Sequence, residues 1–356
     1  MTAEYFPINF LGNRYRLIHQ VGKGGMALVY EAYDQMLERP VAIKLLRQDF
    51  SQDSGFRERF RQEARSAANL SHPNIVTIHD FGEDPHGLFI VMEFMVGKDL
   101  KFRIRDKGQF NVSEAIPIII QACNGLGYAH RAGIIHCDVK PQNMILSEDL
   151  RLKITDFGIS RALSSINEDN KVDVVWGSPQ YLSPEQALGD PPSPASDVYS
   201  VGVVLYEMIT GKLPFNAKST AELIDLHKNQ PPIRPSQINP KCPVELEQII
   251  LKVLSKEPSA RYRTADQLAS ILAAFLERHD RSTEAPDKKN APPPAPFQKE
   301  APTKISFEDY SPIQPKHTTT LDWKLIGLGL LCLFLVGGLL PFWLYIWFSV
   351  KPILGN

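Results

Sequence analysis

The chain has 356 residues, which is enough for two or three units with cores of their own. Charged residues make up 22% of the sequence and the formal net charge is −1, so no overall field favours nucleic acid or an acidic partner. Four cysteines, at positions 123, 137, 242 and 332, form no C-x-x-C pair, which argues against a disulfide framework and against a zinc site.

The first predicted element is a β-hairpin over residues 15–30, where apolar side chains alternate on both sides of a glycine cluster. Gly22, Gly24 and Gly25 lack side chains, so the backbone N–H groups at the tip could close over a polyphosphate. A glycine-rich hairpin is more often an ordinary turn, and by itself this pattern has low specificity.

A short apolar strand that carries one cation follows at residues 41–46. Its period of two places Ala42 and Lys44 on one face and Val41 and Ile43 on the other. Because the apolar neighbours are expected to be buried, the Lys44 ammonium should point into a cleft and need an anionic partner. The simpler alternative is an exposed lysine at a strand edge.

A helix is predicted over residues 56–70, because apolar side chains recur there at helical spacing. The stripe consists of Phe56, Phe60, Ala64, Ala67 and Leu70. Glu63 lies on the border of this buried face. It could form a surface pair with Arg59 at i,i+4 spacing, worth ~0.2–0.5 kcal/mol, or point inward to Lys44, and periodicity alone leaves the two open.

Residues 88–93 are predicted to form another apolar strand, and residues 93–97 a connector to a second, helical lobe. The next stretch, His136-Cys137-Asp138-Val139-Lys140-Pro141-Gln142-Asn143 and then Asp156-Phe157-Gly158, brings together carboxylates, a cation and an amide oxygen. These groups suit the transfer of a phosphoryl group whose charge is screened by metal ions. Each short motif is common by itself, but the two separated by strand-like residues are much more specific. For His136 we expect a structural, hydrogen-bonded role.

These motifs follow one another over about residues 15–275, and in that order they resemble a Hanks-type (eukaryotic-like) bacterial serine/threonine protein kinase with a C-terminal transmembrane helix. The resemblance implies an α+β, bilobal protein-kinase fold with a β-rich, mainly antiparallel N-lobe and a helical C-lobe. We therefore expect an N-terminal extension (1–14), a kinase domain (15–280), a proline-rich disordered linker (281–322), a transmembrane helix (323–350) and a short extracytoplasmic tail (351–356).

The resemblance also implies how ATP is held. Lys44 would hold the α- and β-phosphates and be aligned by Glu63. Glu93 and Met95 would form the hinge that hydrogen-bonds adenine through its backbone, with Met92 behind it. The implied ATP contacts are Val21, Gly22, Gly24, Gly25, Val29, Ala42, Lys44, Glu63, Glu93 and Met95.

For the chemical step, Asp138 resembles the catalytic aspartate that orients the acceptor hydroxyl and takes its proton. Lys140 would neutralise charge on the migrating γ-phosphoryl. Asn143 and Asp156 match the two ligands of Mg²⁺ (or Mn²⁺), a hard cation that suits their oxygen atoms. Catalysis would then depend on alignment and charge screening without a covalent intermediate.

The substrate class also follows from the resemblance. Lys140, two residues after the catalytic aspartate, is similar to the serine/threonine pattern, and residues 177–185 resemble the segment that seats an extended protein substrate. Glu185 would pair with Arg261 to brace the helical C-lobe. Asp197 would support the catalytic segment, residues 136–143. The simpler alternatives are solvated surface charges for the pair and a helix N-terminal carboxylate for Asp197.

Two competing functions remain. One is a catalytically weak pseudokinase that acts as a membrane-tethered scaffold. The presence of every catalytic side chain named above argues against it. The other is a small-molecule phosphotransferase of related fold. Lys140 and residues 177–185 argue against it, because they favour a protein acceptor.

The C-terminal part has the pattern of a membrane anchor. Residues 325–350 are 26 consecutive residues without a charge, longer than the ~20 that span a bilayer core. Residues 281–322 contain eight of the chain's 28 prolines and read as a disordered tether whose ends lie roughly 35–40 Å apart. Lys316 and Lys324 precede the span while only Lys351 follows it, which favours a cytoplasmic N-terminal side.

We therefore expect a single-pass protein of the inner (plasma) membrane with a cytoplasmic kinase domain and no secretory signal peptide. The expected partners are ATP, proteins with serine or threonine acceptors, the membrane, and a second copy of the chain for trans-autophosphorylation. Nucleic acid is not expected. Thr318-Thr319-Thr320 and the other linker threonines are the expected autophosphorylation sites.

The chain departs from the family pattern at two positions. Ala27 replaces the usual third glycine, and Cys137 stands where many members have an arginine that grips a phosphorylated activation loop. The loop between Gly158 and Gly177 contains serines and acidic residues but no threonine.

Because a thiol cannot make the bidentate contact of that arginine, we predict that activity does not require loop phosphorylation through that contact. Phosphatase-treated and untreated chain should therefore show the same turnover. Loss of turnover on dephosphorylation, followed by recovery on rephosphorylation, would contradict this prediction.

Overall fold

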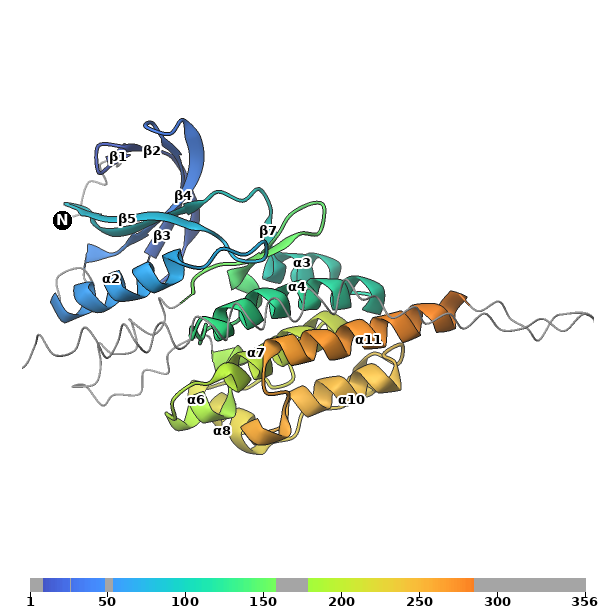
Figure 1. Ribbon diagram of the computed structural model, residues 1–356. Helices are drawn as coiled ribbons and strands as arrows, with labels where there is room; N and C mark the ends of the chain where they lie inside the picture. The colour runs from blue at the N-terminus through green and yellow to red at the C-terminus, as the bar shows by residue number, and fades with distance from the viewer. Residues whose placement is uncertain (1–8, 26, 49–53, 158–178, 285–356) are drawn as a thin grey trace, which may run out of the picture. The chain divides into compact units, whose positions relative to one another are not determined.

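The N-terminal lobe is an antiparallel sheet with one helix. The computed structural model describes residues 9–25, 27–48, 54–157 and 179–284. The sheet has six strands in the order β1-β2-β3-β4-β6-β5, and α2 (Ser54–Ala68) lies between β4 and β5 in the chain (Figure 1). The strands are β1 (Phe10–Leu11), β2 (Tyr15–Lys23), β3 (Ala27–Asp34), β4 (Arg39–Leu46), β5 (Ile78–Asp84) and β6 (Gly87–Glu93).

The C-terminal lobe is helical and also carries a small three-stranded sheet. Its helices are α3 (Leu100–Lys107), α4 (Val112–Arg131), α6 (Pro184–Leu188), α7 (Pro194–Thr210), α8 (Thr220–Asn229), α9 (Pro235–Ile238), α10 (Val244–Val253) and α11 (Ala265–Glu284). The 3₁₀ helices within the described part of this lobe are η1 (Pro141–Asn143), η3 (Pro179–Tyr181) and η4 (Pro258–Ala260). The small sheet consists of β7 (Lys98–Asp99), β8 (Met144–Leu146) and β9 (Leu152–Ile154). The bilobal fold implied by the sequence is confirmed.

The alternation of β4 decides which of its side chains reach the cleft. Val41, Ile43 and Leu45 are buried in a core under the outer face of the sheet. Ala42 and Lys44 lie on the other face and are only partly buried. The apolar stripe of α2, with Phe56 and Phe60 fully covered, packs under that same face against strand residues of β4 and β6. The period of two and the helical stripe are therefore both confirmed.

The sheet begins before residue 15. Strand β1 pairs with β2 through Leu11 opposite Tyr15, and the Leu11 side chain is fully buried. Arg14 holds the turn between them, because its guanidinium donates two hydrogen bonds to the Asp34 carboxylate at 2.8 and 2.7 Å. A two-residue strand has no detectable period, which is why the sequence pattern did not reveal it.

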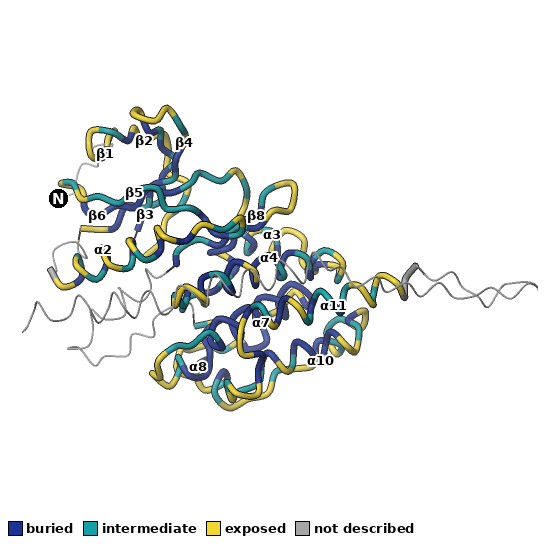
Figure 2. Tube along the Cα trace, in the orientation of Figure 1, coloured by how far each residue is buried: buried dark blue, intermediate teal, exposed yellow. Residues whose placement is uncertain are grey.

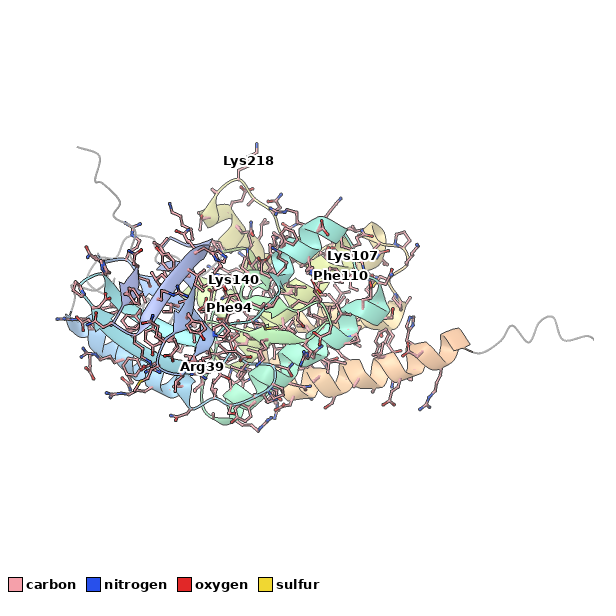
Figure 3. All side chains as sticks on the ribbon, turned by 90° about the horizontal axis from the view of Figure 1, so that it is seen from above. Arg39, Phe94, Lys107, Phe110, Lys140 and Lys218 are labelled. Atoms are coloured by element: carbon pink, nitrogen blue, oxygen red, sulfur yellow. The ribbon has the colours of Figure 1, made fainter. Side chains whose placement is uncertain are left out.

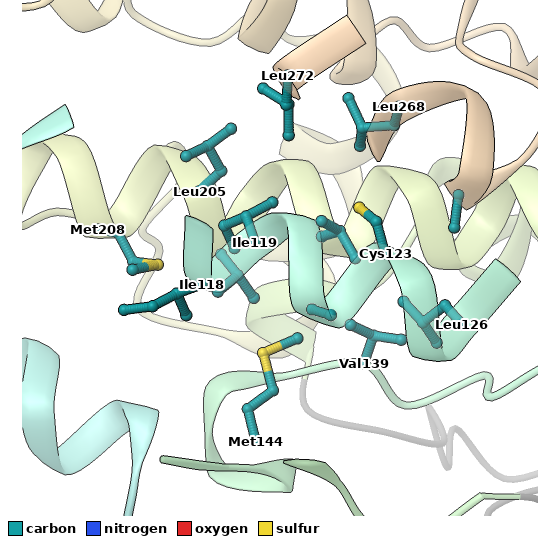
Figure 4. Close-up of a cluster of buried hydrophobic side chains, with 14 of the residues drawn as sticks. Ile118, Ile119, Cys123, Leu126, Val139, Met144, Leu205, Met208, Leu268 and Leu272 are labelled. Carbon is teal, nitrogen blue, oxygen red and sulfur yellow. The ribbon is translucent and has the colours of Figure 1, made fainter. Parts of the chain in front are cut away.

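Helix α7 is the centre of the C-terminal lobe. Every residue after Pro194 in this helix is buried (Figure 2), as expected for a helix that is apolar on all sides. Gly202 allows the close approach of α10, since a Cβ there would lie 2.2 Å from Val253 Cγ1. Helices α4 and α11 complete the core, and Val139, within the catalytic segment, and Met144, directly after it, extend into this core (Figure 4). The core thus anchors the segment that carries the candidate catalytic residues.

The predicted membrane anchor lies outside the described residues. Among the helices of the part of the chain that the structure describes, none has the length and apolar character needed to cross a bilayer. Residues 285–356, which hold most of the predicted linker and all of the span at 323–350, are outside that part. The transmembrane helix therefore stays a prediction.

Candidate active site

Asp138, Lys140 and Asn143 converge at the end of the catalytic segment. Lys140 Nζ lies 2.6 Å from Asp138 Oδ2. The Asn143 amide nitrogen donates to the Asp138 carbonyl at 2.9 Å and to Asp138 Oδ2 at 3.2 Å. Asn143 is the last residue of η1, directly before β8, and its side chain is buried. Its amide group therefore holds Asp138 in place. Lys140 lies where the strands of the N-terminal lobe meet the helices (Figure 3).

A buried carboxylate shapes this segment. Asp197, in the first turn of α7 and 1% exposed, accepts the backbone N–H groups of His136 and Cys137, both at 2.9 Å. Cys137 has a positive φ of 67°, a conformation that is unfavourable for a side chain other than glycine. Two hydrogen bonds to a charged acceptor offset that strain. The predicted support of the catalytic segment by Asp197 is confirmed.

Two residues that the sequence did not single out complete this support. His130 Nε2 lies 2.8 Å from Asp197 Oδ2, and Gln186 Nε2 donates to the Cys137 carbonyl at 2.8 Å. Gln186 is the second member of a capping box with Ser183 at the start of α6. The Ser-x-x-Gln spacing predicts the cap, but the long-range contact of Gln186 has no signal in the sequence.

His136 links the catalytic segment to the Asp-Phe-Gly motif. Its buried ring accepts the Asp138 N–H at Nδ1, 3.2 Å away, and Nε2 lies 2.9 Å from the Thr155 carbonyl oxygen. This pattern assigns the proton to Nε2. The ring also meets the Phe157 ring edge-on, with centroids 4.7 Å apart. The structural role expected for His136 is thus confirmed.

Lys44 and Asp156 form an ion pair across the cleft. Lys44 Nζ lies 2.8 Å from Asp156 Oδ1. Burial by itself raises the pKa of Asp156, but the Lys44 ammonium, helped by Lys140, holds it below its ordinary value. Asp156 also has a positive φ of 69°, so the backbone turns sharply there.

The expected pairing of Lys44 with Glu63 is corrected by this geometry. Among the ion pairs of the described residues, the partner of Lys44 is Asp156. Glu63 lies on α2 at the edge of its buried face, half-buried, and has contacts of its own. Periodicity located Glu63 at the correct edge of the helix, but the rotation and distance of α2 relative to β4 depend on packing between the two.

The hinge is held by both lobes. The Glu93 N–H donates to the Thr77 carbonyl at 2.9 Å, and the Glu93 carboxylate pairs with Lys153 of β9 at 2.7 Å. Gly97 lies so close to β8 that a Cβ there would meet the Leu146 carbonyl oxygen at 2.6 Å. Met95, between them, is partly buried. The Lys153 partner of the hinge was not predicted.

The glycine-rich tip lies at the far end of the hairpin from the hinge. Gly22 pairs with Val29, which in turn lies opposite Lys44 on β4. The Gly24 N–H donates to the Ala27 carbonyl at 2.9 Å, which closes the turn, and Gly25 has open space around its Cα. Val21 is half exposed. The register therefore places Val29, next to the tip, directly beside Lys44 on the same face of the sheet.

Met92 separates the hinge from an apolar pocket behind the ion pair. It lies opposite Ala42 across β4 and β6, and Thr155 donates to its sulfur at 3.7 Å. The pocket is lined by side chains that include Ile75, Ile90, Met92, Asp156 and Phe157. Met92 therefore lines this pocket directly before Glu93, and its role behind an adenine-binding hinge stays a prediction.

The oxygen atoms of Asn143 and Asp156 fit a divalent cation. The Thr155 N–H donates to the Asn143 carbonyl at 2.9 Å, which keeps the two motifs adjacent. Because the Asn143 amide nitrogen donates to Asp138, its Oδ1 is the atom left to coordinate a cation. Among the described residues no cluster of three or more His, Cys, Asp or Glu side chains could hold a metal. Mg²⁺ binds through one or two carboxylates together with substrate phosphates and waters, so the oxygens of Asn143 and Asp156 are enough on the protein side.

A buried ion pair braces the outer part of the lobe. The Arg261 guanidinium donates to both oxygens of Glu185, each at 2.8 Å, and is fully buried. It also donates to the carbonyls of Ala195, Ser255 and Lys256. Burial opposes ionisation of Glu185, but Arg261 and Ser196 outweigh it and lower its pKa. The predicted pair is confirmed.

Comparison with known proteins agrees with this geometry. The sequence matches the protein kinase domain family over residues 15–271. The chain therefore belongs to the protein kinase family.

Similar proteins include serine/threonine-protein kinases of bacteria. The chain is 42% identical to PrkC of Bacillus subtilis over 266 residues, which cover 74% of this chain and 41% of that protein. It is 43% identical to PknB of Mycobacterium tuberculosis over 267 residues, covering 74% and 43%. The kinase domain of Mycobacterium tuberculosis PknI superposes with a TM-score of 0.61 at 25% identity, covering 75% of this chain and 98% of that one. The chain spans less than half the length of the curated relatives it matches.

Arg261→Met is expected to lower the free energy of unfolding by about 3–5 kcal/mol, because it leaves the buried Glu185 carboxylate without its counter-charge. Arg57→Met, which removes an exposed pair with Glu83, is the matched control and should cost less than about 1 kcal/mol. Urea unfolding of a chain ending at Asn290 measures both.

The pH dependence gives a second readout on the same variants. The lowered pKa of Glu185 means that its contribution to stability is present above its unfolded pKa and is lost as the pH falls through the folded value. Equal losses of unfolding free energy in Arg261→Met and Arg57→Met would contradict the structural role assigned to the Glu185–Arg261 pair.

Proposed function

We propose that this chain is a serine/threonine protein kinase that transfers the γ-phosphoryl group of ATP to hydroxyl groups of proteins, itself included. One observation carries the proposal: the Lys140 and Asn143 side chains both lie within hydrogen-bonding distance of Asp138, and Lys44 pairs with Asp156 of the following motif. Membership of the protein kinase family supports it, as do relatives that carry the name serine/threonine-protein kinase.

Each residue then has a defined part in the transfer. The acceptor oxygen forms a bond to the γ-phosphorus, the bond from that phosphorus to the β,γ-bridging oxygen breaks, and the hydroxyl proton passes to Asp138. The contact of Asn143 with Asp138 fixes the orientation of the carboxylate. Lys140, 2.6 Å from Asp138, supplies positive charge where the phosphoryl group passes.

The nucleotide would lie between the glycine-rich tip, the hinge and Lys44. Bound Mg²⁺, or Mn²⁺ in its place, supplies electrostatic screening of the phosphates, and Asn143 and Asp156 would hold it. Lys44 keeps Asp156 in the ionised form that binds a cation. The hinge backbone near Met95 would receive the adenine.

A protein acceptor is favoured over a small molecule. Residues 179–186 run directly beside the catalytic segment, with Gln186 bound to the Cys137 carbonyl. The Tyr181 carbonyl is fixed to α7 by the Ser200 hydroxyl at 2.7 Å. A rigid backbone next to Asp138 is the kind of surface on which an extended polypeptide can lie.

Asp138→Asn should lower the rate of phosphate transfer by roughly 10²–10⁴-fold, because the amide cannot accept the acceptor's proton. The measurement is transfer of labelled γ-phosphate from Mg-ATP to a general protein acceptor and to the chain. Asp149→Asn, an exposed aspartate in the same lobe that pairs with Arg151, is the control and should leave the rate unchanged.

Autophosphorylation is read in the same assay. Phosphate on Thr318, Thr319 or Thr320 should disappear in Asp138→Asn chain expressed in its native cell. Persistent phosphate there would point to another kinase, and full activity of Asp138→Asn would refute the catalytic assignment.

We also infer a single-pass anchor at residues 323–350 in the plasma membrane, with the kinase domain on the cytoplasmic side. The uncharged run of 26 residues and the excess of lysine before it support this. A tethered kinase domain would act on proteins near the inner face of the membrane and meet a second copy there for trans-autophosphorylation.

Removal of residues 323–356 should move the chain from the membrane pellet to the supernatant after alkaline extraction, while activity toward a soluble acceptor is retained. Full-length chain in the supernatant would refute the anchor.

A further inference from the structure

Beside the catalytic segment, a lysine, a tyrosine and a glutamate from three separate elements form one hydrogen-bonded cluster. Lys101 of α3 pairs with Glu207 near the end of α7. The Tyr181 hydroxyl donates to the other oxygen of Glu207 at 2.7 Å and accepts from Lys101 Nζ at 3.1 Å. Neither Lys101 nor Glu207 has a role in the transfer described above.

The cluster adjoins elements that contact the catalytic segment. Helix α3 packs against η1, which carries Asn143 and directly follows Lys140. Tyr181 belongs to the segment from which Gln186 donates to the Cys137 carbonyl. Lys101 therefore links two elements that contact the catalytic segment, and a peptide whose hydroxyl reaches Asp138 would pass near them.

Lys101, Tyr181 and Glu207 differ in how far they are buried, and their roles differ accordingly. The Glu207 side chain is 5% exposed and Tyr181 is 2% exposed, whereas the Lys101 side chain is 33% exposed. Burial, reinforced by the Glu207 charge, raises the pKa of Tyr181, which therefore stays a neutral donor. The Lys101 ammonium is thus the group that neutralises a buried carboxylate and the one that a bound peptide can touch.

The rest of this flank is also rich in cations. Residues 98–107 contain five basic side chains and two acidic ones. Of the acidic pair, Asp99 is occupied in capping α3, since it accepts the Phe102 N–H at 2.8 Å. At the far end of the helix, Lys107 is neutralised by Glu114 (Figure 3). With Glu207 already paired, this side of the acceptor path offers little to a basic residue of a peptide.

We propose that Lys101 is a specificity-determining residue: by occupying the Glu207 carboxylate, it makes this kinase select acceptor segments that are neutral or acidic around the phosphorylated residue. The proposal rests on the proposed kinase function. Removal of the ammonium would leave a buried carboxylate, partly satisfied by Tyr181, facing the peptide path. An arginine side chain of a peptide could then supply the missing charge through a two-pronged contact.

The test uses full-length chain and matched threonine peptides that carry arginine, alanine or glutamate at one flanking position at a time. In wild type, arginine should not raise kcat/KM above alanine at any position. In Lys101→Met, arginine at one or two positions should raise kcat/KM by roughly tenfold over alanine, mainly through KM. The double variant Lys101→Met with Glu207→Gln should lose this gain, because the attracting charge is gone.

Three further variants separate specificity from folding. Lys101→Arg keeps the charge and should keep the wild-type preference. Lys107→Met removes an ammonium from the same helix but leaves Glu207 paired, and should not change the arginine-to-alanine ratio. Lys101→Gln, which can still hydrogen-bond Glu207, serves if Lys101→Met does not fold, and should show the same gain for arginine.

The outcomes divide clearly. A wild-type preference for arginine, or an unchanged ratio in folded Lys101→Met and Lys101→Gln, would overturn the role of Lys101 while leaving the kinase function intact. No transfer by wild type to any peptide, nor to itself, would instead overturn the kinase function and this inference with it.

Discussion

The site depends on one buried carboxylate. Asp197 accepts two successive backbone N–H groups of the catalytic segment and lies within hydrogen-bonding distance of His130. The segment can therefore hold a left-handed residue at Cys137, immediately before Asp138. Since Asp197 is in the first turn of a helix that is buried along almost its whole length, the catalytic segment takes its position from the rigid centre of the lobe.

The second lobe is connected to this centre through the residues around Asp156. The Ile154 N–H donates to the Asn74 carbonyl and the Val76 N–H to the Ile154 carbonyl, so the strand leading to Asp156 pairs with the chain between α2 and β5. The ion pair of Lys44 with Asp156 adds a charged contact from β4. Nucleotide and metal would bind where these contacts meet, which couples ligand binding to the relation between the lobes.

Charge compensation recurs throughout the lobe, and its consequences differ with exposure. The Glu185 carboxylate is paired with Arg261 and both side chains are buried, so that pair is a structural brace. The Glu207 carboxylate is paired with Lys101, whose side chain is still partly exposed. The same chemistry therefore stabilises the fold in one place and, in the role proposed for Lys101, would present a charge to a bound peptide in the other.

The sequence by itself determined the local features, because they depend on spacing along the chain: the two faces of β4, the stripe of α2, and the order of Asp138, Lys140, Asn143 and Asp156. It also identified Asp197, Glu185 and Arg261 through motifs. It could not decide which charges pair over long distances. The partner of Lys44 is Asp156 and not Glu63, Lys153 holds the hinge, and Lys101 reaches Glu207 across more than a hundred residues. Those pairings follow from how helices and strands pack against one another. The spacing of apolar residues within one element does not determine its distance from another.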